Sequence, residues 1–234
     1  MKKNLCCLSR KKGNVVKKKS RFFFKDYSNE WVKCMETRLL PSLRRAMDSC
    51  ARLHKTGGGT ADAAIEKCLC KPVTMLQSHF MALLELLDVA VLAEPIHCLA
   101  HNPLRDADPC SSLWLGGCHP YLFSALLHVL LNYSNRKPTM FDLSWAKGTS
   151  KAQKEMAERV EIEVRAMTPA LEQRFKALLA VDGAGKEDDM RITFLNGNSL
   201  RRSLFVEVMG ETNLHQKARF LVGLASSYFD FSCP

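Results

Sequence analysis

The sequence lacks several features that would assign it to common structural or functional classes. No stretch reaches about 18 consecutive apolar residues, so we expect no transmembrane helix. The apolar run near the start, residues 4–9, is too short for a signal peptide. Alternating strand patterns extend over a few residues at most, and no internal repeat is visible. No Ser/His/Asp order or pair of carboxylates stands out, so we predict that the protein is not an enzyme.

Acidic residues are missing from the first 25 positions, which contain ten Lys and Arg residues. The other 24 Lys and Arg residues are balanced by 24 Asp and Glu residues, so the start of the chain carries the whole net charge of +10. A neutral body does not indicate a general nucleic-acid-binding surface. We predict two parts: a disordered basic arm at residues 1–21 and a single helical domain at residues 22–234.

The arm allows three interpretations. Its basic clusters would bind an anionic membrane surface at about 1 kcal/mol per residue, and acylation of Cys6 or Cys7 would supply the second signal that stable anchoring needs. The same clusters could form a nuclear import signal, or the arm could be only a solvated tail. We predict a peripheral protein of the cytoplasm and plasma membrane, with the nucleus as the alternative. The basic residues concerned are Arg10, Lys11, Lys12, Lys17, Lys18, Lys19 and Arg21.

Disulfide and metal frameworks are also missing, although the chain has 10 cysteines. The cysteines are scattered, which favours reduced and mostly buried thiols of an intracellular protein. A zinc site usually shows two paired clusters, whereas Cys68 and Cys70 have the wrong spacing and residues 97–110 hold only separate metal-capable groups. We therefore predict that no metal is bound. The groups in that segment are His97, Cys98, His101, Asp106, Asp108 and Cys110.

Apolar residues recur every three or four positions along most of the chain, which predicts helices. The first apolar face spans residues 24–47 and contains Pro41, which should kink the helix or start a second one. Thr168 and Pro169 resemble a cap and a first-turn proline, and they predict a new helix to about Ala180. The other predicted features are a loop at 55–63, a helix start near Pro72, an extended connection at 94–112, a charged helix at about 151–166, a loop at 182–189, a helix with Leu200, Leu204 and Val208 on one face, and a cap at Asn213. Together they predict an all-α fold, a bundle of about six to eight helices.

The stretch from Trp114 to Leu131 is the most apolar part of the chain. Gly116 and Gly117 favour a sharp turn, and Pro120 lies where the first turn of a helix would begin. A helix this apolar is normally buried on most sides, so we predict that it is the central helix of the bundle. We expect the Trp114 turn to pack against the first helix, with Trp31 and Trp114 as core aromatic residues.

Several motifs together resemble the plant Delay-of-Germination domain, which also follows the leucine zipper in TGA transcription factors. The motifs are the aromatic-x-x-x-Trp of Tyr27–Trp31, the W-L-G-G of Trp114–Gly117, the N-S-L-R-R-S-L of Asn198–Leu204 and the Q-K-A-R-F-L of Gln216–Leu221. They occur in this order, and the resemblance covers about residues 22–230. We take the motif residues as structural: Tyr27, Trp31, Trp114, Gly116, Gly117, His119 and Pro120.

This resemblance implies a non-enzymatic plant regulatory protein that binds other proteins through its helix faces, and a homo-oligomer is compatible with it. The H-P-Y-L-F of His119–Phe123 is similar to the pollen-aperture members of the family, which implies a role at plasma-membrane domains during pollen wall patterning. The alternative is a nuclear regulator of transcription or seed dormancy that works with DNA-binding partners. No heptads follow the basic arm, so we expect no direct sequence-specific contact with DNA.

The resemblance also implies two ligands that we keep as alternatives to a protein without a cofactor. Members of the family have been associated with haem, and His79, His119 and His128 could each supply an axial nitrogen. An acyl lipid could occupy an apolar pocket near the tryptophans. A histidine beside an apolar stripe is more often a hydrogen-bonded core residue, so our prediction is that no cofactor is bound.

Overall fold

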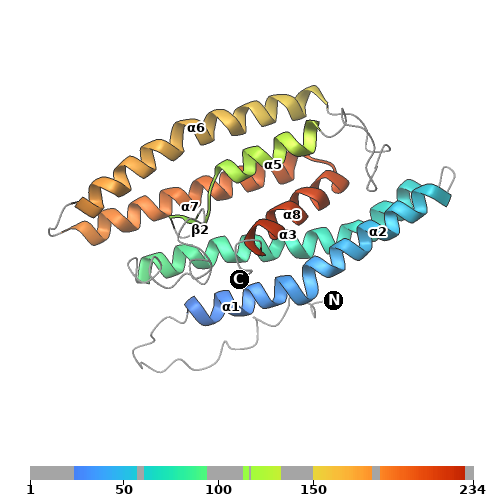
Figure 1. Cartoon of the computed structure of the whole chain (residues 1–234), viewed down its shortest axis with the longest axis horizontal. Coiled ribbons are helices and arrows are strands. Elements are labelled where there is room, and N and C mark those ends of the chain that lie inside the picture. Colours follow the sequence, from blue (N-terminus) through green and yellow to red (C-terminus); the bar gives the residue numbers. More distant parts are fainter. Residues whose placement is uncertain are drawn as a thin grey trace.

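A computed structural model describes residues 24–56, 61–93, 113–115, 117–132, 150–180 and 185–229. The predicted arm at residues 1–21 and the predicted connection at 94–112 lie outside these residues. The described residues form six helical rods (Figure 1), and the all-α prediction is confirmed. The elements are α1 (Phe24–Cys34), the π-helical segment η1 (Met35–Leu39), α2 (Leu40–Thr56), α3 (Ala61–Ala93), β1 (Leu113–Trp114), β2 (Gly117–Cys118), α5 (Tyr121–Asn132), α6 (Lys151–Ala180), α7 (Lys186–Glu211) and α8 (Leu214–Phe229).

The first rod is continuous through α1, η1 and α2, and its helical geometry changes just before Pro41. Proline has no N–H to donate to the carbonyl four residues earlier, which here belongs to Thr37. The helix widens into the π-helical segment immediately before this point, which is a known way to accommodate such a defect. The interruption predicted at Pro41 therefore takes the form of a local widening. The predicted apolar face is confirmed, with Trp31, Met35, Leu39 and Leu43 all buried.

The rods lie side by side around one hydrophobic core. In Figure 1 the first rod and α6 lie on opposite sides, with α3, α7 and α8 between them. α3 contacts α2, α7 and α8, while α6 contacts α5 and α7. By length and composition alone, the segment Ala63–Leu92 of α3 could cross a membrane, but a core helix of a helical bundle meets the same criterion. Its contacts with three neighbouring helices are those of a core helix.

Two predicted helix starts at prolines were wrong, because both prolines lie inside longer helices. α3 begins at Ala61 and contains Pro72, and α6 runs to Ala180 through Pro169. An internal proline costs about 3 kcal/mol in an isolated helix, but tertiary packing outweighs that cost here. In α3 the stripe of buried residues includes Ile65 and Leu69, which both precede the proline. In α6, Thr168 is buried and makes no hydrogen bond through its hydroxyl within the described residues, so it is not a cap.

The prediction that the helix after Trp114 is central was also wrong. α5 does begin directly after Pro120, as predicted, but only Phe123, Ser124 and Leu127 are buried in it. Val129 is 62% exposed on its outer side. The cause is its length of 12 residues and its position, where α6 and α8 are its main neighbours. The helices with the most buried residues are α3, α7 and α8.

The first turns of α6 and α8 are joined by two capping boxes. At α8 the predicted cap is confirmed: the Gln216 N–H donates to Asn213 Oδ1 at 2.9 Å, and the Asn213 N–H donates to Gln216 Oε1 at 2.9 Å. Ser150 and Gln153 repeat this arrangement at α6. Gln153 Nε2 then donates to Gln216 Oε1 at 2.7 Å, so the side chains that cap each helix also connect the two helices.

α7 begins at Lys186, which is three residues before the end of the loop predicted at 182–189. Gly185, with a φ of 93°, directly precedes the helix.

Candidate functional site

The Trp114 turn is held by one buried arginine, and we call this arrangement the Arg201 clasp. Arg201 is 1% exposed, and its Nε donates to the Cys118 carbonyl at 2.8 Å. Its Nη2 donates to the carbonyls of Leu115, at 3.1 Å, and Trp114. The guanidinium carbon also lies 5.1 Å from the centre of the Trp114 ring, within the range of a cation–π contact. The carbonyls and the indole therefore replace the water that a buried charge loses.

Two glycines make the close approach between the turn and α7 possible. A Cβ at Gly117 would lie 2.9 Å from the guanidinium carbon of Arg201, and a Cβ at Gly197 would lie 2.8 Å from Leu115 Cδ1. Gly197 and Arg201 are four residues apart, so they form one face of α7. Leu115, at the tip of the turn, has a φ of 43°, which is uncommon for a residue with a side chain. Gly116 lies outside the described residues.

The expectation that the Trp114 turn packs against the first helix was wrong. The turn packs against α7, where a glycine and an arginine one helical turn apart provide both space and donors for its carbonyls. Trp31, from the first helix, is 2% exposed and contacts different partners. Its ring packs against Phe80 and Tyr228, with centroid distances of 5.4 and 5.5 Å. The two tryptophans are therefore separate anchors in the core.

Asn198 and Arg202 of the N-S-L-R-R-S-L motif join α7 to α3. Asn198 Nδ2 donates to the Leu84 carbonyl and to Asp88 Oδ1, both at 2.6 Å, and Arg202 forms an ion pair with Asp88. Asn198 and Arg202 are again four residues apart. Residues 197–202 therefore contain two pairs, of which Gly197 and Arg201 hold the turn while Asn198 and Arg202 hold α3. This role is structural.

The histidines that could bind haem lie apart, and each contacts its own protein partner. His79 stacks on Trp31 with 4.9 Å between ring centroids, and its Nε2 lies 3.1 Å from the Trp31 carbonyl. In return, Trp31 Nε1 donates to the His79 carbonyl at 2.9 Å. His119 accepts from the Tyr121 N–H through Nδ1, and its Nε2 lies 3.4 Å from Glu172, while His128 Nε2 lies 3.0 Å from Glu161. Burial lowers the pKa of both His79 and His119, which favours the neutral ring.

Cys118 and Tyr228 extend the buried polar cluster around Arg201. Burial raises the pKa of the Cys118 thiol, and the nearby Arg201 charge opposes that rise. Burial also raises the pKa of Tyr228 well above its usual value, and a side-chain hydrogen bond joins Tyr228 to Cys118. A thiol held protonated and enclosed by a hydrogen bond is a poor nucleophile. The cluster is therefore suited to holding the fold together and unsuited to covalent catalysis.

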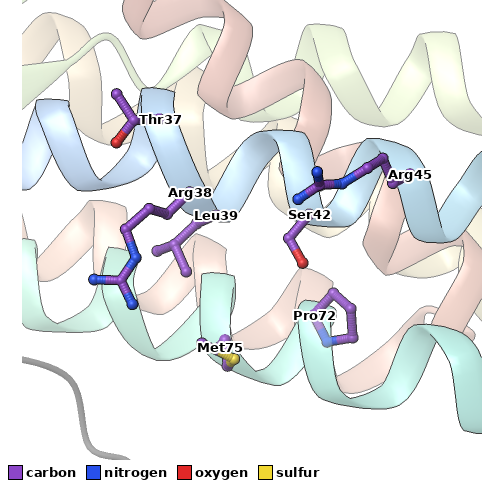
Figure 2. A pocket seen from close by; sticks show the side chains of 7 residues that line it. All are labelled: Thr37, Arg38, Leu39, Ser42, Arg45, Pro72 and Met75. Atoms are coloured by element: carbon purple, nitrogen blue, oxygen red, sulfur yellow. The ribbon is translucent and has the colours of Figure 1, made fainter.

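A solvent-open hollow lies at the π-helical segment, where the first rod meets α3. Its volume is about 300 Å³. Figure 2 shows Arg38 and Arg45 at its two ends, with Pro72 and Met75 of α3 on the opposite wall. We call it the π-segment hollow, and its lining residues are Thr37, Arg38, Leu39, Ser42, Arg45, Pro72 and Met75.

The remaining predicted site residues divide into two groups. Tyr27 and Pro120 belong to the packed body, where Tyr27 is half-buried and burial raises its pKa, with Glu85 adding to the rise. The basic arm, Cys6 and Cys7 lie outside the described residues, as do the metal-capable groups at residues 97–110. Within the described parts of the chain, no group of three or more His, Cys, Asp and Glu residues is arranged to hold a metal ion.

Comparison with known proteins finds relatives that cover most of the chain. The chain is similar to INAPERTURATE POLLEN1 of Arabidopsis thaliana. The identity is 24% over 257 residues, and the match covers 89% of each protein. The INAPERTURATE POLLEN 1 homolog of Oryza sativa subsp. japonica is 24% identical over 211 residues, covering 86% of this chain and 81% of that protein. Neither name states an enzymatic activity. No protein-family model matches the chain.

Sequence reasoning missed Arg201 as the residue around which the turn is organised. One signal was available, because Arg201 lies on the same side of α7 as Leu204 and Val208, where an exposed charge is unexpected. It also missed the hollow, because Arg38 and Arg45 lie outside the apolar face by which that helix was predicted. Their spacing of seven residues, which places them on one side of the rod, was the signal there.

Proposed function

We propose that this chain is a non-enzymatic regulatory protein of the Delay-of-Germination type that acts in pollen-aperture formation. The observation that carries the proposal is the collinear similarity to INAPERTURATE POLLEN1 over 89% of both chains. Within this chain, the W-L-G-G turn and the helix that carries N-S-L-R-R-S-L form one structural unit, although Gly117 and Gly197 are 80 positions apart. The chain would act by presenting helix faces to partner proteins at domains of the plasma membrane.

Exposed apolar side chains on neighbouring helices support a role in binding proteins. Val129 of α5, Ile162 of α6 and Val206 of α7 are 62%, 68% and 56% exposed. Exposed aliphatic residues on adjacent helices provide contact area for a partner or for a second copy of the chain. Ile162→Glu should therefore weaken partner binding while the free energy of unfolding stays nearly constant. Lys154→Glu, at another exposed position of α6, is the matched control.

The experiment that tests the role is expression of a tagged copy in Arabidopsis thaliana plants that lack INAPERTURATE POLLEN1. We expect the protein to gather in patches at the plasma membrane of developing pollen and to restore apertures. Nuclear accumulation without restored apertures would contradict this role. That result would favour the alternative, a nuclear regulator that works through DNA-binding partners.

The basic arm supports membrane association, and cysteine chemistry separates this reading from nuclear import. If charge supplies reversible binding and acylation of Cys6 or Cys7 supplies retention, changing both cysteines to serine should release the protein from membranes. If the arm is an import signal, only neutralising Lys17, Lys18 and Lys19 should change the distribution. High salt should weaken vesicle binding of the unacylated protein, since exposed charges are screened within about 10 Å at 0.1 M ionic strength. Equal binding to neutral and anionic vesicles would count against the membrane role.

A further inference from the structure

The π-segment hollow combines positive charge with an apolar wall. Arg38 and Arg45 contribute two guanidinium groups, and Ser42 contributes a hydroxyl between them. Leu39 of the first rod and the α3 residues at 72 and 75 supply the apolar surface. Among the residues that line the hollow there is no carboxylate. The site is therefore unbalanced in charge, while its wall can cover the carbon atoms of a ligand.

Two donor groups in the hollow, those of Arg45 and Ser42, are available for a ligand. Within the described residues, neither the Arg45 guanidinium nor the Ser42 hydroxyl has a hydrogen-bond or ion-pair partner. Figure 2 shows the Arg45 guanidinium extending back toward Ser42, whose hydroxyl points to the Pro72 side. Thr37 differs, because its hydroxyl already donates to the Lys33 carbonyl at 2.6 Å. The Ser42 hydroxyl thus points into the gap between the two helices, and the Arg45 guanidinium lies along the first rod beside it.

The local backbone explains why a hollow exists at this position. The π-helical turn at Met35–Leu39 is wider than an α-helical turn, and Pro41 follows it directly. Pro72 lies inside α3 on the opposite wall. The hollow is therefore found where the widened turn of the first rod faces the proline of α3. Single π-helical turns inside α-helices also occur frequently at functional sites.

We propose that the π-segment hollow binds a phosphate group carried on a small organic body. A guanidinium presents a fork of N–H donors that matches phosphate oxygens, and a hydroxyl adds a further donor. A volume of about 300 Å³ exceeds what a bare phosphate needs and lies at the lower end of small-molecule sites. The phosphate can belong to a soluble phosphomonoester or to a lipid headgroup. This inference is independent of the role in pollen and concerns a site separate from the basic arm.

The test compares two double variants of the full-length protein that lose the same charge. Arg38→Gln with Arg45→Gln removes the cations of the hollow. Arg44→Gln with Arg52→Gln removes two arginines of the same rod that do not line the hollow, where Arg44 contacts Ser226 and Arg52 contacts Ser49. Circular dichroism and thermal unfolding establish that both variants fold. Binding of inorganic phosphate and glycerol 3-phosphate is measured by calorimetry, and binding to phosphatidylcholine vesicles with and without phosphatidylinositol 4-phosphate by flotation.

We expect the hollow variant to bind at least about tenfold more weakly, because two charge-assisted hydrogen bonds are lost, while the control variant binds like the parent. A loss seen with glycerol 3-phosphate assigns the site to soluble phosphoesters. A loss confined to phosphoinositide vesicles assigns it to a lipid headgroup. The proposal is overturned if both variants lose binding equally, since the effect is then one of net charge, or if the parent binds none of the probes. Ser42→Ala should weaken the same binding by a smaller factor.

Discussion

Arg201 and Arg45 carry the same guanidinium, but the structure uses them in opposite ways. Arg201 is fully buried, and three backbone carbonyls and an indole ring occupy its surroundings. Arg45 lies at the surface beside a hollow, and its guanidinium has no hydrogen-bond or ion-pair partner in the described residues. A charge whose Nε and Nη2 donate to backbone carbonyls stabilises the fold, whereas a charge with available donors can bind a ligand. The comparison assigns stability to the Arg201 clasp and binding to the π-segment hollow.

The largest effect should come from removing the clasp. Arg201→Met has a similar length but leaves the carbonyls of Trp114, Leu115 and Cys118 buried without donors, so we expect a loss of about 3 kcal/mol in the free energy of unfolding. Denaturant unfolding measures it. Arg159→Met is the control, since Arg159 forms an exposed ion pair with Glu207 at 2.9 Å that should contribute less than about 1 kcal/mol. Equal losses in the two variants would contradict the structural role of Arg201.

Acid should destabilise the protein through a buried histidine, while the contribution of the Arg201 clasp to stability should not change with pH. Burial, together with the nearby charge of Arg219, lowers the pKa of His215 from its ordinary value of 6.5 to about 4. A lowered folded-state pKa means that the unfolded chain binds the proton first, so this contribution is fully present above pH 6.5 and is lost as the pH falls toward 4. The loss should reach about 3 kcal/mol. Burial also lowers the pKa of His79 and His119, which adds to the trend.

Unfolding curves of the parent and of His215→Gln between pH 7 and pH 4 test this expectation. The variant should lose less stability over that interval, because one group that binds protons on unfolding is gone. Arg201 stays charged throughout the interval, even though burial lowers its pKa. The same pH dependence in parent and variant would show that other groups account for acid sensitivity.

A smaller effect should follow from adding one carbon atom beneath the clasp. The Cβ of Gly117→Ala would meet the guanidinium carbon of Arg201 at 2.9 Å, so we expect a loss of about 1–3 kcal/mol by overpacking. Gly210→Ala in α7 is the matched control, because nothing lies within 4 Å of its new Cβ. That helix position should become more stable by up to about 1 kcal/mol. Thermal unfolding of the two variants should therefore shift in opposite directions.

The smallest change in stability should come from the hollow. Arg38→Gln combined with Arg45→Gln should alter the free energy of unfolding by less than about 0.5 kcal/mol, since both side chains are exposed. A loss comparable with that of Arg201→Met would remove the distinction between the two sites. The measurement is denaturant unfolding in buffer free of phosphate, so that a bound ligand does not stabilise the parent.

Periodicity predicted most of the helices because each buries one face. It succeeded for the first rod, for α7 and for α8, and the Asn213 cap was predicted from local chemistry alone. It failed at Pro72 and Pro169, because packing along the whole helix outweighs the local cost of a proline. It misplaced α5, since a composition rich in apolar residues does not say how many neighbours a helix has.

The candidate site depended on contacts that local sequence does not contain. Arg201 is buried only because three carbonyls converge on it, and Cys118 lies 83 residues earlier in the chain. The hollow likewise requires the π-helical segment of the first rod to lie opposite Pro72 of α3. The sequence contains the two motifs, Trp114–Gly117 and Asn198–Leu204, but neither motif indicates that it contacts the other.

The distance along the chain between Arg201 and its acceptors also constrains how the protein folds. Asn198 and Arg202 face α3, whereas the turn covers Arg201, so α7 can pack against α3 while the Arg201 guanidinium is still in contact with water. When the turn packs onto α7, the guanidinium loses that water and gains the carbonyl oxygens together, which avoids the cost of burying an unpaired charge. A single arginine thus couples the burial of the turn to the presence of a helix that follows about 80 residues later.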